Sequence, residues 1–264
     1  MTAPASQDID FQESGEGPPV LFVPGSFATP AAWRAMHRLL PGHRLVSTSI
    51  LGYGGTAETR KLDDLDMAHE LRVVEAAAAR IGEPVHLVGH SFGGTIALAA
   101  ALSGHIAVRS IATFEANPLA LIAARGRHDL FDDARTMATA FEAAHLDGEA
   151  DAAGRVIDYW GGAGAFAALP PPVQDFCRKT TWANVLDWRT AFAFGAAPAD
   201  YARLSMPVLL VRGAKAVPSM VEITEALSRA MPQAKTAVVE GAGHFLISTH
   251  PAECAALLRD FLAR

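Results

Sequence analysis

The stretch Val88–Gly89–His90–Ser91–Phe92–Gly93–Gly94 decides the fold, because it joins two segments of different character. A short apolar run, Val85–Gly89, precedes it, and an alanine-rich helical stretch, Phe92–Leu102, follows it. A serine on a tight strand-to-helix turn adopts a strained backbone, and glycines on either side let neighbouring backbone pass close by. The pattern predicts an α/β sheet with the Ser91 hydroxyl exposed above a strand end. The alternative is an ordinary serine in a glycine-rich turn, holding a phosphate.

The same alternation of apolar runs and helical stretches extends along the chain on both sides of this turn. It predicts a doubly wound, mostly parallel sheet covered by helices on both faces. The expected strands are Val20–Pro24, Leu45–Ile50, Val85–Gly89, Val108–Glu115, Val208–Gly213 and Thr236–Glu240, with Asp8–Glu13 as an antiparallel edge strand. The expected helices are Ala31–Leu40, Asp64–Ile81, Phe92–Leu102, Val221–Met231 and Pro251–Leu262.

The alternation stops after Glu115 and resumes near Leu204. The residues between them carry helical patterns with glycine and proline breaks, and Leu130–Leu146 is the strongest helix candidate. Most of the aromatic side chains lie here, and each of them either packs a small helical layer or lines an apolar pocket beneath it. We therefore expect a helical insertion at residues 116–203 and a core made of residues 1–115 and 204–264.

Length, composition and charge exclude several classes of protein. The 264 residues are half apolar, which suits one large domain or two small ones and excludes disorder. The net charge is −6 and basic residues form no run, so nucleic-acid binding is disfavoured. Two cysteines, Cys177 and Cys254, lie far apart without a CxxC partner, which suits a reducing compartment.

Membrane insertion and export are not expected. Residues 1–19 contain no Lys, Arg or apolar block, which argues against a leader, so we expect a cytoplasmic protein. The most apolar stretch, Ile96–Val108, is interrupted by Ser103, Gly104 and His105, and it is shorter than the roughly 20 residues that span a bilayer.

The Ser91 hydroxyl needs a base before it can act as a nucleophile, and histidine has the best-matched pKa. His244 stands in Gly241–Ala242–Gly243–His244–Phe245, directly after the last expected strand, where a loop could reach the serine. His250 precedes Pro251 and is predicted to cap a helix, and His90 is predicted to point away from Ser91. The helix that starts at Phe92 directs unpaired N–H groups, including that of Phe92, toward an oxyanion formed at the serine.

These motifs together resemble those of the α/β-hydrolase fold family over almost the whole chain. Pro24–Gly25–Ser26–Phe27 is similar to the family's HG-x loop, although Pro24 stands where His is usual. The resemblance implies that the Ser26 backbone N–H donates to an oxyanion, that Ser91 is the nucleophile and that His244 is the base. Gly52–Tyr53–Gly54–Gly55–Thr56 resembles the family's glycine-rich loop, and the insertion resembles its helical cap.

The acid of the triad is where the chain departs from the family pattern. Relatives place an aspartate shortly after the strand that follows the cap, but this position is Ala216 here. Glu115 is the best replacement, because it ends the strand after the serine's helix, and one branch of haloalkane dehalogenases carries its acid there. The alternative for Glu115 is a carboxylate that caps the entry to the insertion. Other candidates for the acid are Asp158, Asp200 and Glu222.

No cofactor or metal is expected. Gly52-x-Gly54-x-x-Ala57 superficially matches a dinucleotide fingerprint, but the polar stretch Glu58–Asp66 follows it in place of an immediate helix. The sequence contains no HExxH motif, EF-hand loop or Cys/His cluster with ligand spacing.

The sequence thus predicts a cofactor-independent serine hydrolase that cleaves a small or medium apolar ester or lactone through an acyl-enzyme. The expected partner is a small-molecule substrate. A serine at Ser91 argues against dehalogenase and epoxide hydrolase chemistry, because those relatives carry Asp there. A carbon–carbon bond hydrolase, a hydroxynitrile lyase and a perhydrolase use the same site and remain alternatives. So does a ligand-binding receptor with little activity, since fold does not settle function.

Overall fold

A seven-stranded sheet forms the centre of the computed structural model, which describes residues 9–263. Within that range the sheet order is β1-β3-β2-β4-β5-β6-β7, and β1 is antiparallel to β3 while the other pairs are parallel. The strands are β1 (Gln12–Ser14), β2 (Pro19–Val23), β3 (Arg44–Ser47), β4 (Val85–His90), β5 (Val108–Phe114), β6 (Val208–Gly213) and β7 (Lys235–Val239). The predicted mostly parallel α/β sheet is confirmed. The antiparallel edge strand expected at Asp8–Glu13 is β1, which begins only at Gln12 and ends at Ser14, and Asp8 lies outside the described residues.

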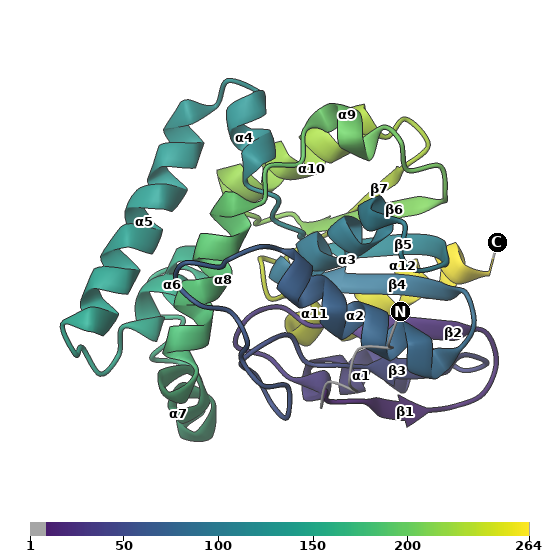
Figure 1. Ribbon diagram of the computed structural model, residues 1–264, viewed down its shortest axis with the longest axis horizontal. Coiled ribbons are helices and arrows are strands. Elements are labelled where there is room, and N and C mark those ends of the chain that lie inside the picture. The colour runs from purple at the N-terminus through teal and green to yellow at the C-terminus, as the bar shows by residue number, and fades with distance from the viewer. Residues whose placement is uncertain (1–8, 264) are drawn as a thin grey trace.

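Helices cover both faces of the sheet (Figure 1). Leu21, Leu87 and Leu210 point to the face that packs against α2, α3 and α10, whereas Phe22 and Val88 point to the face covered by α1 and α12. This explains why β2 is apolar at every position. These core helices are η1 (Pro30–Trp33), α1 (Arg34–His37), α2 (Ala68–Ile81), α3 (Phe92–Ser103), α10 (Pro218–Ala230), α11 (Leu246–Thr249) and α12 (Pro251–Leu262).

Three expected helices differ in their extent. The helix expected at Val221–Met231 is α10, which begins three residues earlier, at Pro218. The helix expected at Asp64–Ile81 begins at Ala68, because Lys61 and Asp64 pair in an isolated bridge and the Asp66 carboxylate accepts the Ala68 N–H at 2.8 Å. The stretch expected to be one helix at Ala31–Leu40 is divided into a 3-10 turn, η1, and the short α1. None of these differences changes the order of the strands in the sheet.

The residues between β5 and β6 are helical in the described structure. Four helices, α5, α6, α7 and α8, stand together at one side of the sheet, and α9 lies beside α10 (Figure 1). α6 ends at Gly161 and α7 begins after Pro170, at the breaks that the sequence indicates. The bounds are α4 (Ala120–Ala124), α5 (His128–Leu146), α6 (Ala153–Gly161), α7 (Pro171–Lys179), α8 (Thr181–Ala193) and α9 (Pro198–Tyr201). None of the described helices is both long and apolar enough to cross a membrane.

The strand order places a crevice between the ends of β2 and β4. After β2 the chain continues to β3 on one side, and it then returns to form β4 on the other side. Such a switch in winding direction opens a space at the carboxyl ends of the two strands, where ligands of open α/β sheets bind. Ser26 follows β2 and Ser91 follows β4, so both serines lie at this crevice.

Candidate active site

Ser91 occupies a strained turn between β4 and α3. Its φ and ψ angles are 54° and −127°, a conformation that L-residues rarely adopt. A Cβ on Gly93 would overlap the carbonyl oxygens of Val23 and Pro24, and a Cβ on Gly89 would overlap the Gly93 carbonyl. The glycines therefore let the turn pack directly against the end of β2. The position and geometry agree with the turn expected from the sequence.

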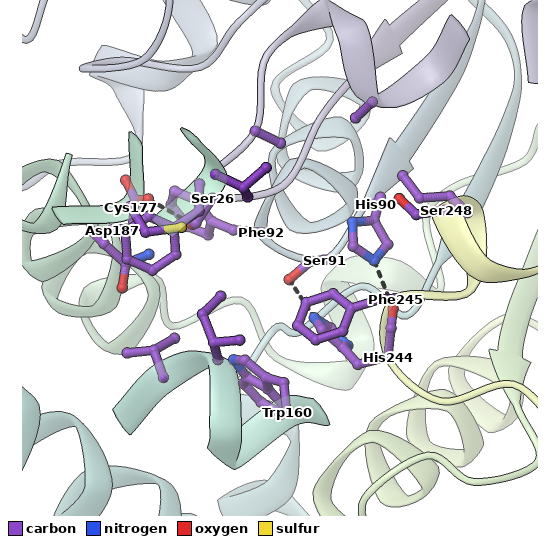
Figure 2. Close-up of a pocket in the computed structure, with 18 of the residues that line it drawn as sticks. Ser26, His90, Ser91, Phe92, Trp160, Cys177, Asp187, His244, Phe245 and Ser248 are labelled. Atoms are coloured by element: carbon purple, nitrogen blue, oxygen red, sulfur yellow. Dashed lines mark hydrogen bonds between the residues drawn. The ribbon is translucent and has the colours of Figure 1, made fainter. Parts of the chain in front are cut away.

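Ser91, His244 and Glu115 form a continuous hydrogen-bonded chain. The His244 Nε2 atom lies 3.0 Å from the Ser91 Oγ atom (Figure 2). The His244 Nδ1 atom lies 2.8 Å from Glu115 Oε2. An ionised carboxylate only accepts, so Nδ1 carries the proton and Nε2 is left to accept the serine proton. All three side chains are buried. The structure thus brings together the three residues that sequence reasoning selected.

Glu115 is held rigidly at the end of β5. Its φ angle is 51°, and its second oxygen, Oε1, accepts the Gly213 backbone N–H at 2.8 Å. Burial works to raise the pKa of Glu115, but the hydrogen bonds and charge of His244 and the Gly213 N–H hold it below its usual range. Glu115 is therefore a carboxylate at neutral pH, which is the form that stabilises a neighbouring imidazolium.

The other candidate acids have partners elsewhere. Asp158 accepts the backbone N–H groups of Gly164 and Phe166, at 3.1 Å and 2.8 Å. Asp200 accepts the N–H at the start of α9, and Glu222 pairs with Arg125 and Arg127 on the far side of the insertion. Each of these carboxylates is thus engaged away from His244.

Two backbone N–H groups are available beside the serine. The loop after β2 passes so close that a Cβ on Gly25 would lie 3.0 Å from the Ser91 Cβ, and this places Ser26 at the cavity wall. Phe92 is the first residue of α3, and the first N–H of a helix has no acceptor within it. No backbone acceptor is recorded for the Ser26 N–H within residues 9–263. Both groups are free to donate to an oxyanion at Ser91.

A cavity of about 640 Å³ lies above these groups, between the sheet and the helices that follow β5. Its walls are mainly apolar, and none of the described residues that line it is Lys or Arg. Asn117, Asn184 and Asp187 are its polar side chains on the insertion side. The apolar side chains contributed by the insertion are Val156, Ile157, Trp160, Leu169, Pro172, Val173, Phe176, Trp188 and Ala191.

An aromatic stack on the insertion ends on the candidate base. The Trp160 ring lies 4.8 Å from the His244 ring at an interplanar angle of 24°, and Trp188 stacks on Trp160 at 5.7 Å and 5°. The sequence left open whether these aromatics pack or line a pocket. Trp160 and Trp188 do both, whereas Trp182 is 38% exposed and does not line the cavity.

His90 supports the loop that carries His244. Its Nε2 atom lies 2.9 Å from the His244 carbonyl oxygen, and burial lowers the pKa of His90 to about 3 (Figure 2). His90 is therefore neutral and donates its Nε2–H to that carbonyl. Sequence reasoning missed this contact, because the two residues lie 154 positions apart. His250 is the N-cap residue of α12, as expected, but its side chain makes no cap hydrogen bond, and its Nδ1 atom contacts the Thr249 hydroxyl at 2.9 Å.

A second buried group, Asp187 on α8, also faces the cavity and was not selected from the sequence. Its carboxylate accepts hydrogen bonds from the Ser26 hydroxyl at 2.6 Å, the Tyr53 hydroxyl at 2.7 Å and the Arg60 guanidinium at 2.8 Å. Figure 2 shows Asp187 and Ser26 facing each other at the end of the cavity opposite His90. Nothing in its spacing from the other motifs indicates this role.

The described residues contain no group of three or more His, Cys, Asp or Glu side chains that could hold a metal ion. Cys177 lines the cavity, and burial raises the pKa of its thiol to about 11. The thiol is therefore protonated at neutral pH and is a poor nucleophile beside the hydrogen-bonded Ser91.

Comparison with known proteins agrees with this architecture. The model of the alpha/beta hydrolase family matches residues 20–257. No curated protein matches the chain in sequence.

Solved structures match over nearly the full length. A bromoperoxidase from Bacillus anthracis is 17% identical, with a TM-score of 0.77 and coverage of 97% of this chain and 95% of that one. An epoxide hydrolase from Vigna radiata is 19% identical, with a TM-score of 0.74 and coverage of 98% and 99%. A thermophilic esterase from Thermogutta terrifontis is 22% identical, with a TM-score of 0.72 and coverage of 97% and 93%. These structures share the fold, and their different activities leave the chemistry to be argued from the site.

Proposed function

Because the chain belongs to the alpha/beta hydrolase family, we propose that it is a cofactor-independent serine hydrolase acting on a small or medium apolar ester or lactone. The observation that carries the proposal is the chain of contacts from Ser91 through His244 to Glu115, at 3.0 Å and 2.8 Å. This order of nucleophile, base and carboxylate is the arrangement that activates a serine for acyl transfer.

The reaction proceeds in two halves through an acyl-enzyme. His244 Nε2 takes the proton from Ser91 Oγ as that oxygen attacks the substrate carbonyl, and the protonated imidazole then gives the proton to the leaving alcohol. In the second half His244 removes a proton from water, which attacks the acyl group and releases the carboxylic acid and the free serine. Glu115 stabilises the imidazolium in both halves.

Two backbone N–H groups can donate hydrogen bonds to the substrate carbonyl oxygen, on which negative charge develops during the reaction. The Ser26 and Phe92 backbone N–H groups flank Ser91 and have no competing backbone acceptor among the described residues. Removing one such donor typically lowers kcat by roughly 10²–10³-fold. Two such donors would stabilise the tetrahedral intermediates of acyl transfer.

The cavity favours an uncharged substrate. It has about 640 Å³, mainly apolar walls, no Lys or Arg among its described lining residues, and one buried carboxylate, Asp187. An acyl chain that carries its own carboxylate would lose its hydration without gaining a cationic partner. We therefore expect aryl and alkyl esters of neutral acids to react much faster than monoesters of dicarboxylic acids.

Active-site labelling tests the proposal. A fluorophosphonate should form a covalent adduct on Ser91 that mass spectrometry locates, and Ser91→Ala should abolish both the adduct and the hydrolysis of a 4-nitrophenyl ester. Ser248→Ala is the matched control, because Ser248 lines the same cavity away from the His244 ring. A folded wild-type protein that stays unlabelled would overturn the proposal and favour the ligand-binding reading.

A further inference from the structure

The loop that carries one oxyanion donor is tied to the insertion by a single short hydrogen bond. Ser26 Oγ donates to Asp187 Oδ2 at 2.6 Å, although 161 positions separate the two residues. Ser26 lies just after β2 and Asp187 lies on α8, and the two side chains meet at one end of the cavity (Figure 2). The contact therefore joins the two layers that enclose the cavity.

Asp187 is held in place by two further donors. Tyr53 donates its hydroxyl proton to the same oxygen, Oδ2, and Arg60 binds the other oxygen, Oδ1. Burial raises the pKa of Asp187, and the charge of Arg60 and the hydrogen bonds from Ser26 and Tyr53 oppose that rise. With donors on both oxygens and only 2% exposure, the carboxylate is fixed in one orientation.

Arg60 is itself anchored on the core side. Its side chain is fully buried and pairs with Glu58, Glu70 and Asp187 at 2.7, 3.2 and 2.8 Å. Burial raises the pKa of Glu70, and the charge of Arg60 opposes that rise. Arg60 thus sits among three acidic side chains, and Asp187 is the one that lines the cavity.

This network limits what Ser26 can do. Its single hydroxyl proton points to Asp187, so the side chain has no proton left for a substrate oxyanion, and the backbone N–H is the group that remains for that purpose. The next residue, Phe27, has a φ angle of 56°, which a non-glycine residue rarely adopts. The side-chain anchor thus lies beside a strained residue of the same loop.

We propose that Asp187 is a positioning residue: through the Ser26 hydroxyl it holds the loop after β2 so that the Ser26 backbone N–H points at the oxyanion. This inference rests on the proposed serine hydrolase function. It implies that α8 must be docked on the core for full activity, because α8 supplies the carboxylate that orients a core donor.

Two variants remove the Ser26 donation to a carboxylate from opposite sides. In Asp187→Asn, the amide oxygen faces Arg60 and the amide N–H₂ group faces the two hydroxyls, so Ser26 can no longer donate to this side chain and accepts at most a weaker, neutral hydrogen bond from it. In Ser26→Ala, the anchor is lost while Asp187 keeps Arg60 and Tyr53. Tyr53→Phe is the matched control, because it removes one donor to Asp187 Oδ2 but leaves the Ser26 contact intact.

Steady-state hydrolysis of a 4-nitrophenyl ester is the first readout. We expect each of the two variants to lower kcat by roughly 10–100-fold, a fraction of the loss of a whole donor, with KM changed by less than about threefold. Both substitutions act on one contact, so their effects on kcat should not multiply. The kcat of the double variant should lie within about threefold of that of the slower single variant. Tyr53→Phe should keep kcat within about threefold of the wild type.

A boronic acid, which forms a tetrahedral adduct on serine, is the second readout. Phenylboronic acid should bind Asp187→Asn at least about tenfold more weakly than the wild type, whereas an unreactive apolar competitor should bind both equally. Urea unfolding identifies any variant that fails to fold, and Ser26→Ala, whose side chain is only partly buried, then serves in place of Asp187→Asn.

The positioning role would be overturned if both variants kept the kcat and the boronic acid affinity of the wild type. Ser91 would then still be labelled by the fluorophosphonate, and the proposed function would stand. Loss of labelling in the wild type would instead overturn the function itself. A rise in KM alone, with kcat unchanged, would assign Asp187 to substrate binding and also overturn the inference.

Discussion

Glu115 Oε2 lies 2.8 Å from His244 Nδ1, although 129 positions separate these residues in the chain. The carboxylate comes from the end of β5, one strand away from the β6 loop where the family usually places it. That loop carries Ala216 here. The Gly213 N–H at the end of β6 binds the other carboxylate oxygen, so β6 still helps to orient the acid.

Replacing Glu115 should slow turnover without unfolding the protein. In Glu115→Gln the carboxylate that keeps the proton on Nδ1 and stabilises the imidazolium is lost, so we expect kcat for an aryl ester to fall by about 10²–10⁴-fold. Glu222→Gln is the control, because it also removes a mostly buried carboxylate that pairs with arginines, but away from His244. Equal kcat values for the two variants would exclude Glu115 as the acid.

Trp160 should contribute to the rate through its stacking on His244. An aromatic face beside an imidazolium is worth roughly 0.5–2 kcal/mol, so Trp160→Leu should lower kcat about 2–30-fold. Trp182→Leu makes the same substitution on a partly exposed tryptophan that does not line the cavity, and it should leave kcat within about twofold. If both substitutions lower kcat alike, the effect belongs to the stability of the insertion and not to the stack.

Gly93 should tolerate no side chain. Ala at this position places a Cβ against the Val23 and Pro24 carbonyls, which the sheet holds in place, so we expect Gly93→Ala to lower the free energy of unfolding by more than about 2 kcal/mol. Gly104, at the end of α3, has a φ angle of 70°, and a Cβ there would meet no atom within 4 Å. Gly104→Ala should therefore lower the free energy of unfolding by only about 1 kcal/mol, through backbone strain alone. Urea unfolding of both variants checks this difference, and equal losses would contradict it.

Two partly buried histidines should make the fold less stable in mild acid. Burial lowers the pKa of His37 and of His86 from 6.5 to about 4. Between these values the unfolded chain binds protons that the folded chain does not, so the free energy of unfolding should fall as pH decreases from about 7 to 4. Each histidine should contribute on the order of 1–3 kcal/mol.

The variant His86→Gln checks this pH dependence. Urea unfolding at pH 7, 6 and 5 should show a shallower decrease for the variant than for the wild type. His105→Gln is the control, since His105 is exposed and its ring contacts Glu75 at the surface. Identical slopes for His86→Gln and the wild type would show that His86 is not a source of the effect.

Much of the sheet could be predicted because its strands are short apolar runs. β6 begins and ends as expected, and β2, β4, β5 and β7 lie within one residue of the expected limits. β3 ends at Ser47, three residues early, since its register with β2 stops there and the last bond between them runs from the Thr48 N–H to the Phe22 carbonyl at 3.2 Å. The hydrophobic pattern indicates which residues are buried, but it does not indicate where the backbone pairing between two strands ends.

The residues of the candidate site also differ in whether the sequence alone could reveal them. Ser91 and His244 stand in glycine-rich loops next to strands, and Glu115 ends a strand, so each leaves a local signal. Asp187 leaves none, because it lies within a helix and its partner Ser26 lies 161 positions away. Contacts between the insertion and the core depend on how the two pack, which no sequence spacing reveals.

The stacked indoles of Trp160 and Trp188 give the cavity an intrinsic fluorescence signal. Both rings border the cavity, and one of them touches the imidazole that the proposed reaction protonates. Their emission should therefore change when a bound molecule displaces water from the cavity. Trp33 is sealed in the core and Trp182 is partly exposed outside the cavity, so these two supply a constant background. Occupancy can thus be followed by fluorescence with no added dye, even for compounds that are never turned over.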